Sequence, residues 1–397
     1  MGETSHILAL WRRAQAQGQS VCLATVVHIE GSSYRKPGAR MLLTSGGERA
    51  GSISGGCLEG EISRKAWWLT TDGPSIQRYQ SSFEEDAGGI PWGLGCGGTV
   101  WVLLERDPDP VLRALEAAQE QGEPAVVLTC LRSSHGCSPG TVEILSPLHT
   151  DRHSAAAASP ELAAAVESAL LERRSMTIQH EDPFAAGEEG ELPAWFVEYL
   201  SPPPRVTLFG AGDDAQPIAR FAEELGWRVC VADGRSHLLR PERFPSGTGL
   251  RLLRYNDETA APACGVPGDI GSISAIPSVT TGVLPSEFAV ILTHSWEQDR
   301  ALLQALLPAG LAYLGILGPR HRTLSLLEHV GPALGWSLEA CWNALHGPVG
   351  LDLGGRDPAV IALSIVAELQ ATAAARSVTV TRLHKGSDKA PTPAVYG

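Results

Sequence analysis

One stretch decides the fold of this 397-residue sequence: Arg205-Val-Thr-Leu-Phe-Gly-Ala-Gly-Asp-Asp-Ala215. Its apolar run Arg205–Phe209 predicts a buried strand, and the G-x-G-x-x-A turn from Gly210 leads into a predicted helix. Asp233 ends the next predicted strand, 21 residues after Gly212, where a ribose-binding acid belongs in a dinucleotide-binding fold. This strand–turn–helix context predicts a Rossmann-like, doubly wound parallel sheet.

Nucleotide binding by this turn is a separate question from its fold. Gly210 and Gly212 would let a pyrophosphate approach the backbone, and together with Asp233 they favour a NAD(P) site and an oxidoreductase function. Asp213 and Asp214, however, place negative charge at the helix N-terminus, where a pyrophosphate needs positive potential. They would act instead as N-cap and first-turn acids that satisfy the exposed amides. Both interpretations stay open, the NAD(P)-dependent oxidoreductase and a fold that keeps the turn without the nucleotide.

The alternation of strands and helices continues to the end of this half. Predicted strands Phe288–Thr293 and Leu311–Gly315 are each followed by a predicted helix, which is typical of a parallel α/β sheet covered on both faces. The stiff run Pro202-Pro203-Pro204 predicts a domain boundary. We expect a mixed α/β N-terminal domain over residues 1–200, a Rossmann-like domain with a terminal helix over residues 201–385, and a flexible tail over residues 386–397.

Composition and charge narrow the function classes. Hydrophobic residues make up 43% and charged residues 19% of the chain, which indicates a globular protein. The net charge of −13 leaves no basic surplus for a phosphate backbone, so nucleic acid is not an expected partner. No apolar run is long enough for a membrane span. Eight cysteines, with no CxxC pair and no secretory signal, predict a cytoplasmic protein with free thiols.

Two glycine-flanked cysteines stand out in the first half. Gly55 and Gly56 let the backbone fold tightly and offer its amides to an anion. Cys57 then falls at the start of a predicted helix, whose dipole favours the thiolate. That placement suits a nucleophile, a sulfur carrier or a soft-metal ligand, whereas the ordinary alternative is a small buried cysteine beside a turn. Cys96, within Gly93-Leu-Gly-Cys-Gly-Gly98, has the same two interpretations.

Polar residues follow two later strands of the Rossmann-like half. His294 ends a predicted strand at the face where open α/β sheets bind ligands. It is therefore a candidate ligand contact, and a loop histidine satisfied by its own neighbours is the alternative. Arg320 follows another strand-to-helix turn and could meet an anionic group.

These motifs together resemble the XdhC/CoxI family, which are accessory factors for molybdenum hydroxylases such as xanthine dehydrogenase. The resemblance runs in order through both halves of the chain. The matching segments are Gly31–Met41, Gly51–Glu59, Gly95–Gly98, Leu208–Pro217, Val231–Arg235, Thr293-His294, Leu314–Arg320, His346–Asp352 and Ile361–Glu368.

The resemblance implies a protein that binds and protects the molybdenum cofactor, a molybdopterin. Such a factor supports exchange of an oxo ligand for the terminal sulfido ligand and delivers the cofactor to its hydroxylase. The implied partners are an apo molybdenum hydroxylase of the xanthine dehydrogenase type and a cysteine desulfurase. We expect a maturation factor and not the hydroxylase itself, because the chain lacks the cysteine runs of iron–sulfur clusters. A homodimer is also expected, since a second copy easily completes a glycine-lined site rimmed by loops.

Under this resemblance the candidate residues take specific roles. The cofactor carries a dithiolene and a phosphate, so a thiolate suits its molybdenum or a sulfane sulfur. We expect Cys57 to be the transient molybdenum ligand or sulfur relay, with Cys96 assisting. The supporting residues are Gly55 and Gly56, which would admit the ligand to the backbone, and Arg35 and Arg40, which would meet the phosphate.

Overall fold

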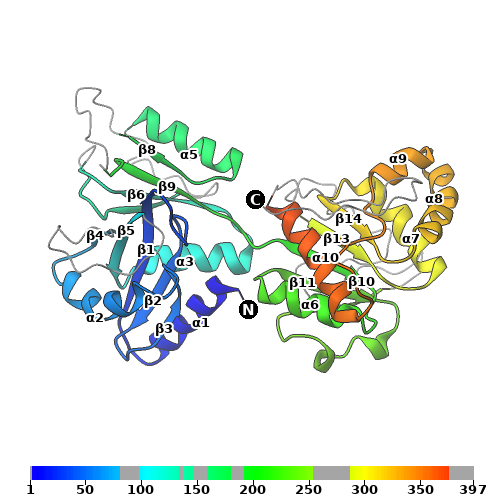
Figure 1. Ribbon diagram of the computed structural model, residues 1–397, viewed down its shortest axis with the longest axis horizontal. Coiled ribbons are helices and arrows are strands. Elements are labelled where there is room, and N and C mark those ends of the chain that lie inside the picture. Colours follow the sequence, from blue (N-terminus) through cyan, green and yellow to red (C-terminus); the bar gives the residue numbers. More distant parts are fainter. Residues whose placement is uncertain are drawn as a thin grey trace, which may run out of the picture. The chain divides into compact units, whose positions relative to one another are not determined.

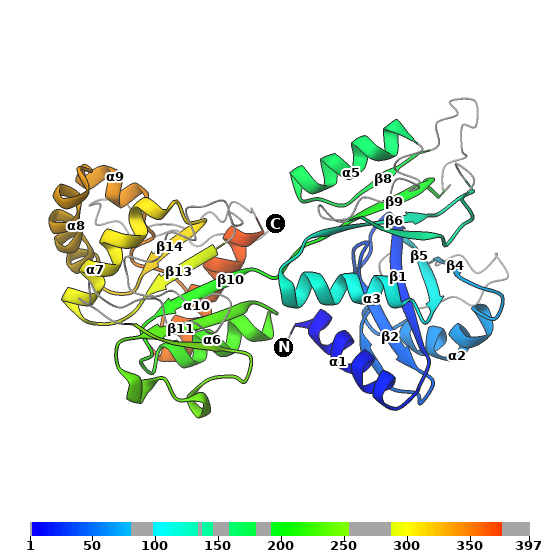
Figure 2. The same ribbon diagram turned by 180° about the vertical axis from the view of Figure 1, so that it is seen from behind.

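The computed structural model describes residues 2–80, 98–133, 137–145, 159–179, 192–253 and 287–374. The chain divides into two compact units, Met1–Pro203 and Pro204–Gly397, and the division falls within the proline run. Unit 1 is coloured from blue to green and unit 2 from green to red (Figure 1, and from behind in Figure 2). None of the described helices is long and apolar enough to cross a membrane.

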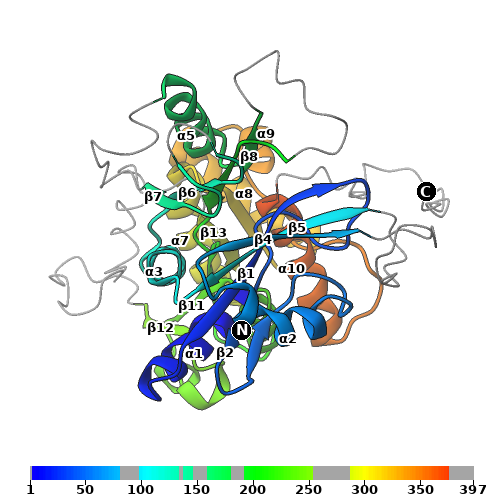
Figure 3. The same ribbon diagram turned by 90° about the vertical axis from the view of Figure 1, so that its left-hand side faces the viewer.

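The first sheet of unit 1 is antiparallel throughout, in the order β3-β2-β1-β5-β4. Figure 3 labels β1, β2, β4 and β5 of this sheet. Side chains of β1 alternate between two apolar layers because successive residues of a strand point to opposite faces. Val21 and Leu23 pack with α1 and α3, whereas Cys22 and Ala24 pack with α2. The elements are β1 (Val21–Glu30), β2 (Arg40–Thr44), β3 (Arg49–Gly51), β4 (Ser75–Gln80), β5 (Thr99–Arg106), α1 (Glu3–Ala16), α2 (Glu59–Leu69) and α3 (Asp109–Glu116).

A second antiparallel sheet of unit 1 has the order β7-β6-β9-β8. Its strand β6 also alternates: Val126 and Leu128 pack against α5, and Ala125 and Val127 join the core formed by α1 and α3. The prediction of a mixed α/β N-terminal domain is therefore confirmed. The elements are β6 (Ala125–Cys130), β7 (Val142–Leu145), β8 (Met176–Ile178), β9 (Trp195–Leu200) and α5 (Pro160–Glu172).

A buried charge cluster connects the two sheets of unit 1. Arg40 of β2 donates to Glu198 of β9 with both terminal nitrogens, at 2.7 Å and 2.5 Å, and each side chain is 7% exposed. Arg40 also donates to the Gly38 carbonyl at 3.0 Å, which secures the end of the loop before β2. Glu105 of β5 lies in the same interior. Burial raises the pKa of Glu105 to about 7, although the charge of Arg40 lowers it.

Unit 2 contains a parallel sheet in the order β12-β11-β10-β13-β14. The direction of winding reverses between β10 and β13, as in a doubly wound fold, so the predicted Rossmann-like class is confirmed. Helices α6 and α10 cover one face, and α7, α8 and α9 cover the other. The elements are β10 (Arg205–Phe209), β11 (Arg228–Asp233), β12 (Gly249–Leu252), β13 (Glu287–Ile291), β14 (Tyr313–Ile316), α6 (Ala215–Glu224), α7 (Trp296–Leu306), α8 (Arg320–Leu334), α9 (Leu338–Asn343) and α10 (Pro358–Ala373).

We expect the wild type to lose stability between pH 5 and pH 8 because Glu105 ionises, and Glu105→Gln to lack this decrease. The folded pKa of Glu105 is about 7 and its ordinary value is 4.5, so its stabilising contribution is complete below pH 4.5 and is lost as the pH rises through 7. The variant should therefore have a higher free energy of unfolding at pH 8, by roughly 2 to 3 kcal/mol at most. Urea denaturation across this pH range measures it, with the surface variant Glu172→Gln as control. Parallel pH curves for wild type and Glu105→Gln would contradict it.

Candidate functional site

Cys57 lies on an exposed turn directly before α2, and a buried carboxylate holds this turn from within. Oε1 of Glu59 accepts hydrogen bonds from the Ser52 hydroxyl at 2.8 Å and from the amides of Ile53 and Ser54 at 3.1 and 2.9 Å. Its Oε2 accepts from the Ser54 hydroxyl at 2.5 Å. Burial opposes ionisation of Glu59, but these bonds outweigh it and lower its pKa to about 2. The carboxylate is therefore a structural anchor of the turn.

Several backbone amides that were expected to bind an anion donate to Glu59 or Ser54 instead. Two amides bond to Glu59, and those of Gly56 and Leu58 donate to the Ser54 hydroxyl at 3.2 and 3.1 Å. Gly56 has a φ of +111°, a conformation that favours glycine. Gly55 and Gly56 are both exposed, so the backbone beside the thiol is open to solvent. The turn therefore presents an exposed thiol after two glycines, and several of its amides are already occupied by Glu59 and Ser54.

The loop that follows β1 lies against this turn. A Cβ at Gly55 would be 3.8 Å from the ring of Tyr34, so the ring packs on the glycine although Tyr34 is 74% exposed. Arg35, from the same loop, forms an ion pair with Glu3 of α1. Its Nε is buried and has no hydrogen-bond partner within the described ranges. The ring of Tyr34 therefore packs on the turn that carries Cys57, at a glycine two residues before the thiol.

Two other residues were expected at the cofactor site, Arg40 and Cys96, and the structure does not bring the Arg40 guanidinium to the turn of Cys57. Arg40 is an interior residue whose guanidinium bonds to Glu198, so a phosphate could reach it only by displacing that carboxylate. Cys96 lies outside the described residues. Gly98 is described, and a Cβ there would be 2.1 Å from the Ser32 carbonyl oxygen, so the close approach requires glycine. Among the residues that the structure describes, no group of three or more His, Cys, Asp or Glu side chains could hold a metal ion.

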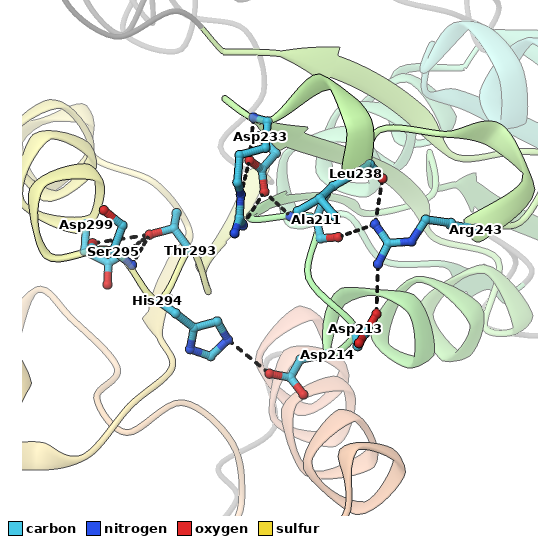
Figure 4. A network of polar contacts seen from close by, with 11 residues as sticks. Ala211, Asp213, Asp214, Asp233, Leu238, Arg243, Thr293, His294, Ser295 and Asp299 are labelled. Atoms are coloured by element: carbon cyan, nitrogen blue, oxygen red, sulfur yellow. Dashed lines mark hydrogen bonds and ion pairs between the residues drawn. The ribbon is translucent and has the colours of Figure 1, made fainter.

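In unit 2, the turn after β10 touches the end of β13. Gly210 has a φ of +125°, and a Cβ there would lie 2.4 Å from the carbonyl oxygen of Leu292. The side chain of Asp233 is 0% exposed and accepts from the Ala211 amide at 2.6 Å and from Arg235 at 2.8, 3.0 and 2.8 Å (Figure 4). Burial opposes ionisation of Asp233, but the bonds from Arg235 and Ala211 lower its pKa. Asp233 therefore holds the turn to β11.

Asp214 is the N-cap residue of α6, as the sequence predicts, but its side chain makes no capping hydrogen bond. Instead, Asp213 and Asp214 each pair with a basic side chain, which corrects the expectation that they satisfy the exposed amides. Oδ1 of Asp213 accepts from Arg243 Nη2 at 2.9 Å, and Arg243 Nη1 donates to the Ala211 carbonyl at 2.7 Å. Oδ2 of Asp214 lies 3.1 Å from Nε2 of His294, which has a φ of +60° (Figure 4). His294 thus has a partner within its own domain.

This arrangement does not fit a bound NAD(P). Asp233, the acid expected to bind the ribose, is buried and already accepts four hydrogen bonds from the protein. Asp213 and Asp214 place two carboxylates beside the helix N-terminus, where a pyrophosphate requires positive potential. One feature agrees with the expected nucleotide site: the backbone at Gly212 is open to a ligand, because a Cβ there would meet nothing within 4 Å.

Arg320 begins α8 after the carboxyl end of β14. Its guanidinium carbon lies 5.1 Å from the centre of the Trp342 ring. Arg322, two residues further along, pairs with Asp299 through Nη1 and Oδ2 at 2.6 Å. Asp299 Oδ1 accepts from the Thr293 hydroxyl at 2.5 Å. The hydrogen bond from Thr293 to Asp299 and the ion pair between Arg322 and Asp299 therefore connect the segment after β13 to the first turn of α8, which follows β14.

Glu368 of α10 organises a further polar centre. Its Oε1 lies 2.9 Å from Nδ1 of His346, and its Oε2 accepts from the Tyr313 hydroxyl at 2.9 Å and the Gly350 amide at 2.6 Å. Burial opposes ionisation of Glu368, but these bonds lower its pKa, the one from His346 most. The rings of Tyr313 and His346 are stacked, with centroids 4.2 Å apart. Glu368 therefore fixes the segment 346–350 beside β14.

Sequence reasoning assigned no role to the residues that organise these centres. They are Glu59, Arg243, Asp299, Arg322 and Glu368. One signal was available for Glu368, because it is the only charged residue in the otherwise apolar and small-residue helix α10. A lone charge in such a helix must find partners when it is buried. The partners themselves come from distant segments and cannot be identified from the local pattern.

Comparisons with known proteins cover both halves. A family model of the XdhC Rossmann domain matches residues 206–369, and a model of the XdhC and CoxI family matches residues 14–80. The chain is 27% identical over 358 residues to a probable xanthine dehydrogenase subunit of Bacillus subtilis, covering 88% of this chain and 92% of that protein. It is 24% identical over 393 residues to the molybdenum cofactor insertion chaperone PaoD of Escherichia coli, covering 98% and 91%.

A solved structure is also similar. A crystal structure described as a xanthine dehydrogenase from Bacillus halodurans has a TM-score of 0.65 and 26% sequence identity, and the match covers 96% of this chain and 99% of that one. Both halves of the chain therefore match the family that the sequence motifs predicted.

We expect Glu59→Gln to lower the free energy of unfolding at pH 7 by about 2 kcal/mol, because the amide replaces an acceptor oxygen with a donor that faces other donors. The folded pKa of Glu59 is about 2 and its ordinary value is 4.5, so its contribution is complete above pH 4.5 and is lost as the pH falls towards 2. Urea denaturation at pH 7 and pH 3 should show the two proteins converging at the lower pH. Glu172→Gln removes an exposed carboxylate and is the control. An equal effect of both variants at pH 7 would refute the anchoring role.

We expect no saturable binding of NADH or NADPH up to millimolar concentration, because the acids after β10 repel the pyrophosphate. Nicotinamide fluorescence and its anisotropy measure binding. The variant Gly212→Val is the control, since a side chain at this open position would obstruct only a ligand that approaches the turn. Saturable binding by the wild type that this variant abolishes would overturn the expectation.

Proposed function

This chain belongs to the XdhC and CoxI family, and we propose that it binds the molybdenum cofactor and delivers it to a molybdenum hydroxylase. Cys57 carries the proposal: of the six described cysteines it alone is exposed. Thiolates are preferred ligands of soft metals and acceptors of sulfane sulfur. The relatives include a protein named as a molybdenum cofactor insertion chaperone and one named as a probable xanthine dehydrogenase subunit, which supports this role.

The residues around Cys57 give the thiol access and a fixed position. Gly55 and Gly56 carry no side chain that would shield it from a bulky ligand. Glu59 holds the turn, so the thiol is presented without reorganisation of the backbone. As a molybdenum ligand, Cys57 binds the cargo directly. As a sulfur relay, it carries a sulfane sulfur received from a cysteine desulfurase and supports sulfuration of the cofactor.

The other expected site residues have different roles in the proposed function. Arg35 stays the proposed phosphate contact: its Nη2 pairs with Glu3, but its Nε has no hydrogen-bond partner within the described residues, and the neighbouring Tyr34 packs on Gly55. Arg40 acts from the interior and positions the start of β2. Cys96 stays a proposed assisting thiol. In unit 2, Gly210, Gly212, Asp233 and His294 shape the turn after β10 and bind no nucleotide in this proposal.

We propose an apo-hydroxylase of the xanthine dehydrogenase type and a cysteine desulfurase as partners, and a homodimer in the cytoplasm. The names of the relatives support the hydroxylase, and the exposed thiol supports the desulfurase. The six described cysteines are all free, which agrees with a reducing compartment. Light scattering of the purified protein tests the dimer.

The deciding experiment compares Cys57→Ala with the wild type, both purified without oxygen from a host that makes the cofactor. We expect near-stoichiometric molybdenum and pterin in the wild type and at least about ten-fold less in the variant, because its metal or sulfur contact is lost. Elemental analysis and the fluorescence of the oxidised pterin measure the two components. Cys137→Ala, which removes a half-buried thiol of the same unit, should retain the cofactor.

Each other outcome has a definite meaning. If neither protein contains molybdenum or pterin, the carrier function is refuted. If Cys57→Ala retains as much cofactor as the wild type and also supports sulfuration, the carrier function stands and the role of Cys57 is wrong.

A further inference from the structure

We propose that the outward face of α2, together with the ring of Tyr34, is the surface on which the apo-hydroxylase docks to receive the cargo of Cys57. We call it the α2 face, and the exposed residues of α2 that form it are Gly60, Arg64, Lys65 and Trp68. The inference rests on the proposed function in one respect, because it takes the hydroxylase as the recipient of the cofactor. Its own evidence is the helical spacing, the exposed rings and the distribution of charge beside the thiol.

The α2 face is the outward side of a helix whose other side is buried. Ile62 is 0% exposed and belongs to the apolar core that covers one side of β1. Gly60, Arg64 and Trp68 follow one another at intervals of four residues, and residues with this spacing lie along one stripe of a helix. A Cβ at Gly60 would meet nothing within 4 Å, so the stripe is open where it begins, three residues after Cys57.

Two aromatic rings near the thiol are left in solvent. Trp68 and Tyr34 are each 74% exposed, whereas Trp11 of the same unit is buried. The Tyr34 ring packs on Gly55, two residues before the thiol. Trp, Tyr and Arg are the residue types most enriched among the side chains that dominate the binding energy of protein interfaces. The two rings and the guanidinium of Arg64 therefore supply the anchors of an interface.

The charged residues of α2 are divided between its two sides. Glu59 and Glu61 are 4% and 6% exposed, whereas Arg64 and Lys65 are exposed. Lys65 pairs with Glu61 at 2.7 Å, and Arg64 has no ion pair among the residues that the structure describes. The net charge of the whole chain is −13, so the α2 face presents positive charge in an otherwise acidic protein. This sign favours a partner surface that carries carboxylates, and it disfavours a basic one.

The recipient must therefore present carboxylates beside apolar pockets for an indole ring and a phenol ring. A guanidinium pairs with a carboxylate through two parallel hydrogen bonds, so Arg64 fixes the orientation of the partner as well as attracting it. Helix α2 has 11 residues and is about 16 Å long. One interface of ordinary size, roughly 800 Å² on each partner, thus includes both Trp68 and the turn of Cys57. A protein bound there contacts the thiol that holds the cofactor, which is the condition for direct transfer.

The experiment measures the binding of this chain to a purified apo-hydroxylase of the xanthine dehydrogenase type from the same organism, by calorimetry at two ionic strengths. We expect Trp68→Ala and Arg64→Glu each to weaken binding by about ten-fold or more, because each removes an anchor of the interface. Binding by the wild type should weaken as salt is added, and Arg64→Glu should lose most of this dependence. Circular dichroism confirms that each variant is folded.

Matched control variants come from the same unit. Leu171→Ala truncates an apolar residue of α5 that is 76% exposed, and Arg113→Glu reverses an exposed charge of α3. Both should bind the hydroxylase as the wild type does. Trp68→Ala should also retain molybdenum and pterin at the wild-type level, because it changes the docking surface and not the thiol. Its defect lies in transfer, which is measured as the hydroxylase activity that the loaded protein restores.

Equal binding of the hydroxylase by the wild type, Trp68→Ala and Arg64→Glu, or no binding by the wild type, would overturn the proposal. If the two variants weaken binding of a cysteine desulfurase but not of the hydroxylase, the hydroxylase is refuted as the occupant. Hydroxyl-radical oxidation of Trp68 in the free protein at the slow rate of the buried Trp195 would mean that the chain itself or a second copy covers the surface, and would also overturn it. Hydroxylase binding that depends on Trp68 in a protein without cofactor would support the docking surface and refute the carrier function alone.

Discussion

A carboxylate that leaves water must receive hydrogen bonds from its new surroundings, and this constraint shapes the loops around each candidate site. Glu59 collects hydroxyl and amide donors and thereby folds the turn that presents Cys57. Asp233 does the same for the turn after β10, and Glu368 for the segment beside β14. In each case the charge is interior and the loop is built around it. Removal of the donors would leave a buried charge, so loop and acid depend on each other.

This arrangement separates the groups that hold the structure from those that are accessible. The anchoring acids are buried, whereas Cys57 and the Tyr34 ring that packs on Gly55 are exposed. In unit 2 the same separation explains why a Rossmann-type turn does not imply a dinucleotide. Both carboxylate oxygens of Asp233 already accept hydrogen bonds from Arg235 or Ala211. The two aspartates that follow the turn are negatively charged, which is the wrong sign for binding a pyrophosphate.

The strands and helices followed closely from local patterns, because their apolar periodicity is repeated over many residues. The strand Arg205–Phe209 was predicted with these bounds, and α6 follows the Gly210 turn as predicted. The strand before His294 ends two residues earlier than predicted, at Ile291. Apolar character continues through Leu292, but the hydrogen-bonded ladder with β10 stops where the chain turns towards Gly210. Ladder ends depend on the neighbouring strand, which a local pattern does not contain.

By itself, the sequence determined the two-part α/β organisation, the Rossmann-like sheet, the family resemblance and the candidate thiol at Cys57. These depend on periodicity and on short motifs, which are properties of neighbouring residues. Only the tertiary structure decided how each charge is used. Arg40 faces Glu198, which is 158 positions away in the chain, and becomes an interior ion pair. Asp214 faces His294 rather than the amides of its own helix. The charge state and accessibility of a side chain are set by what folds against it, and those partners come from distant parts of the chain.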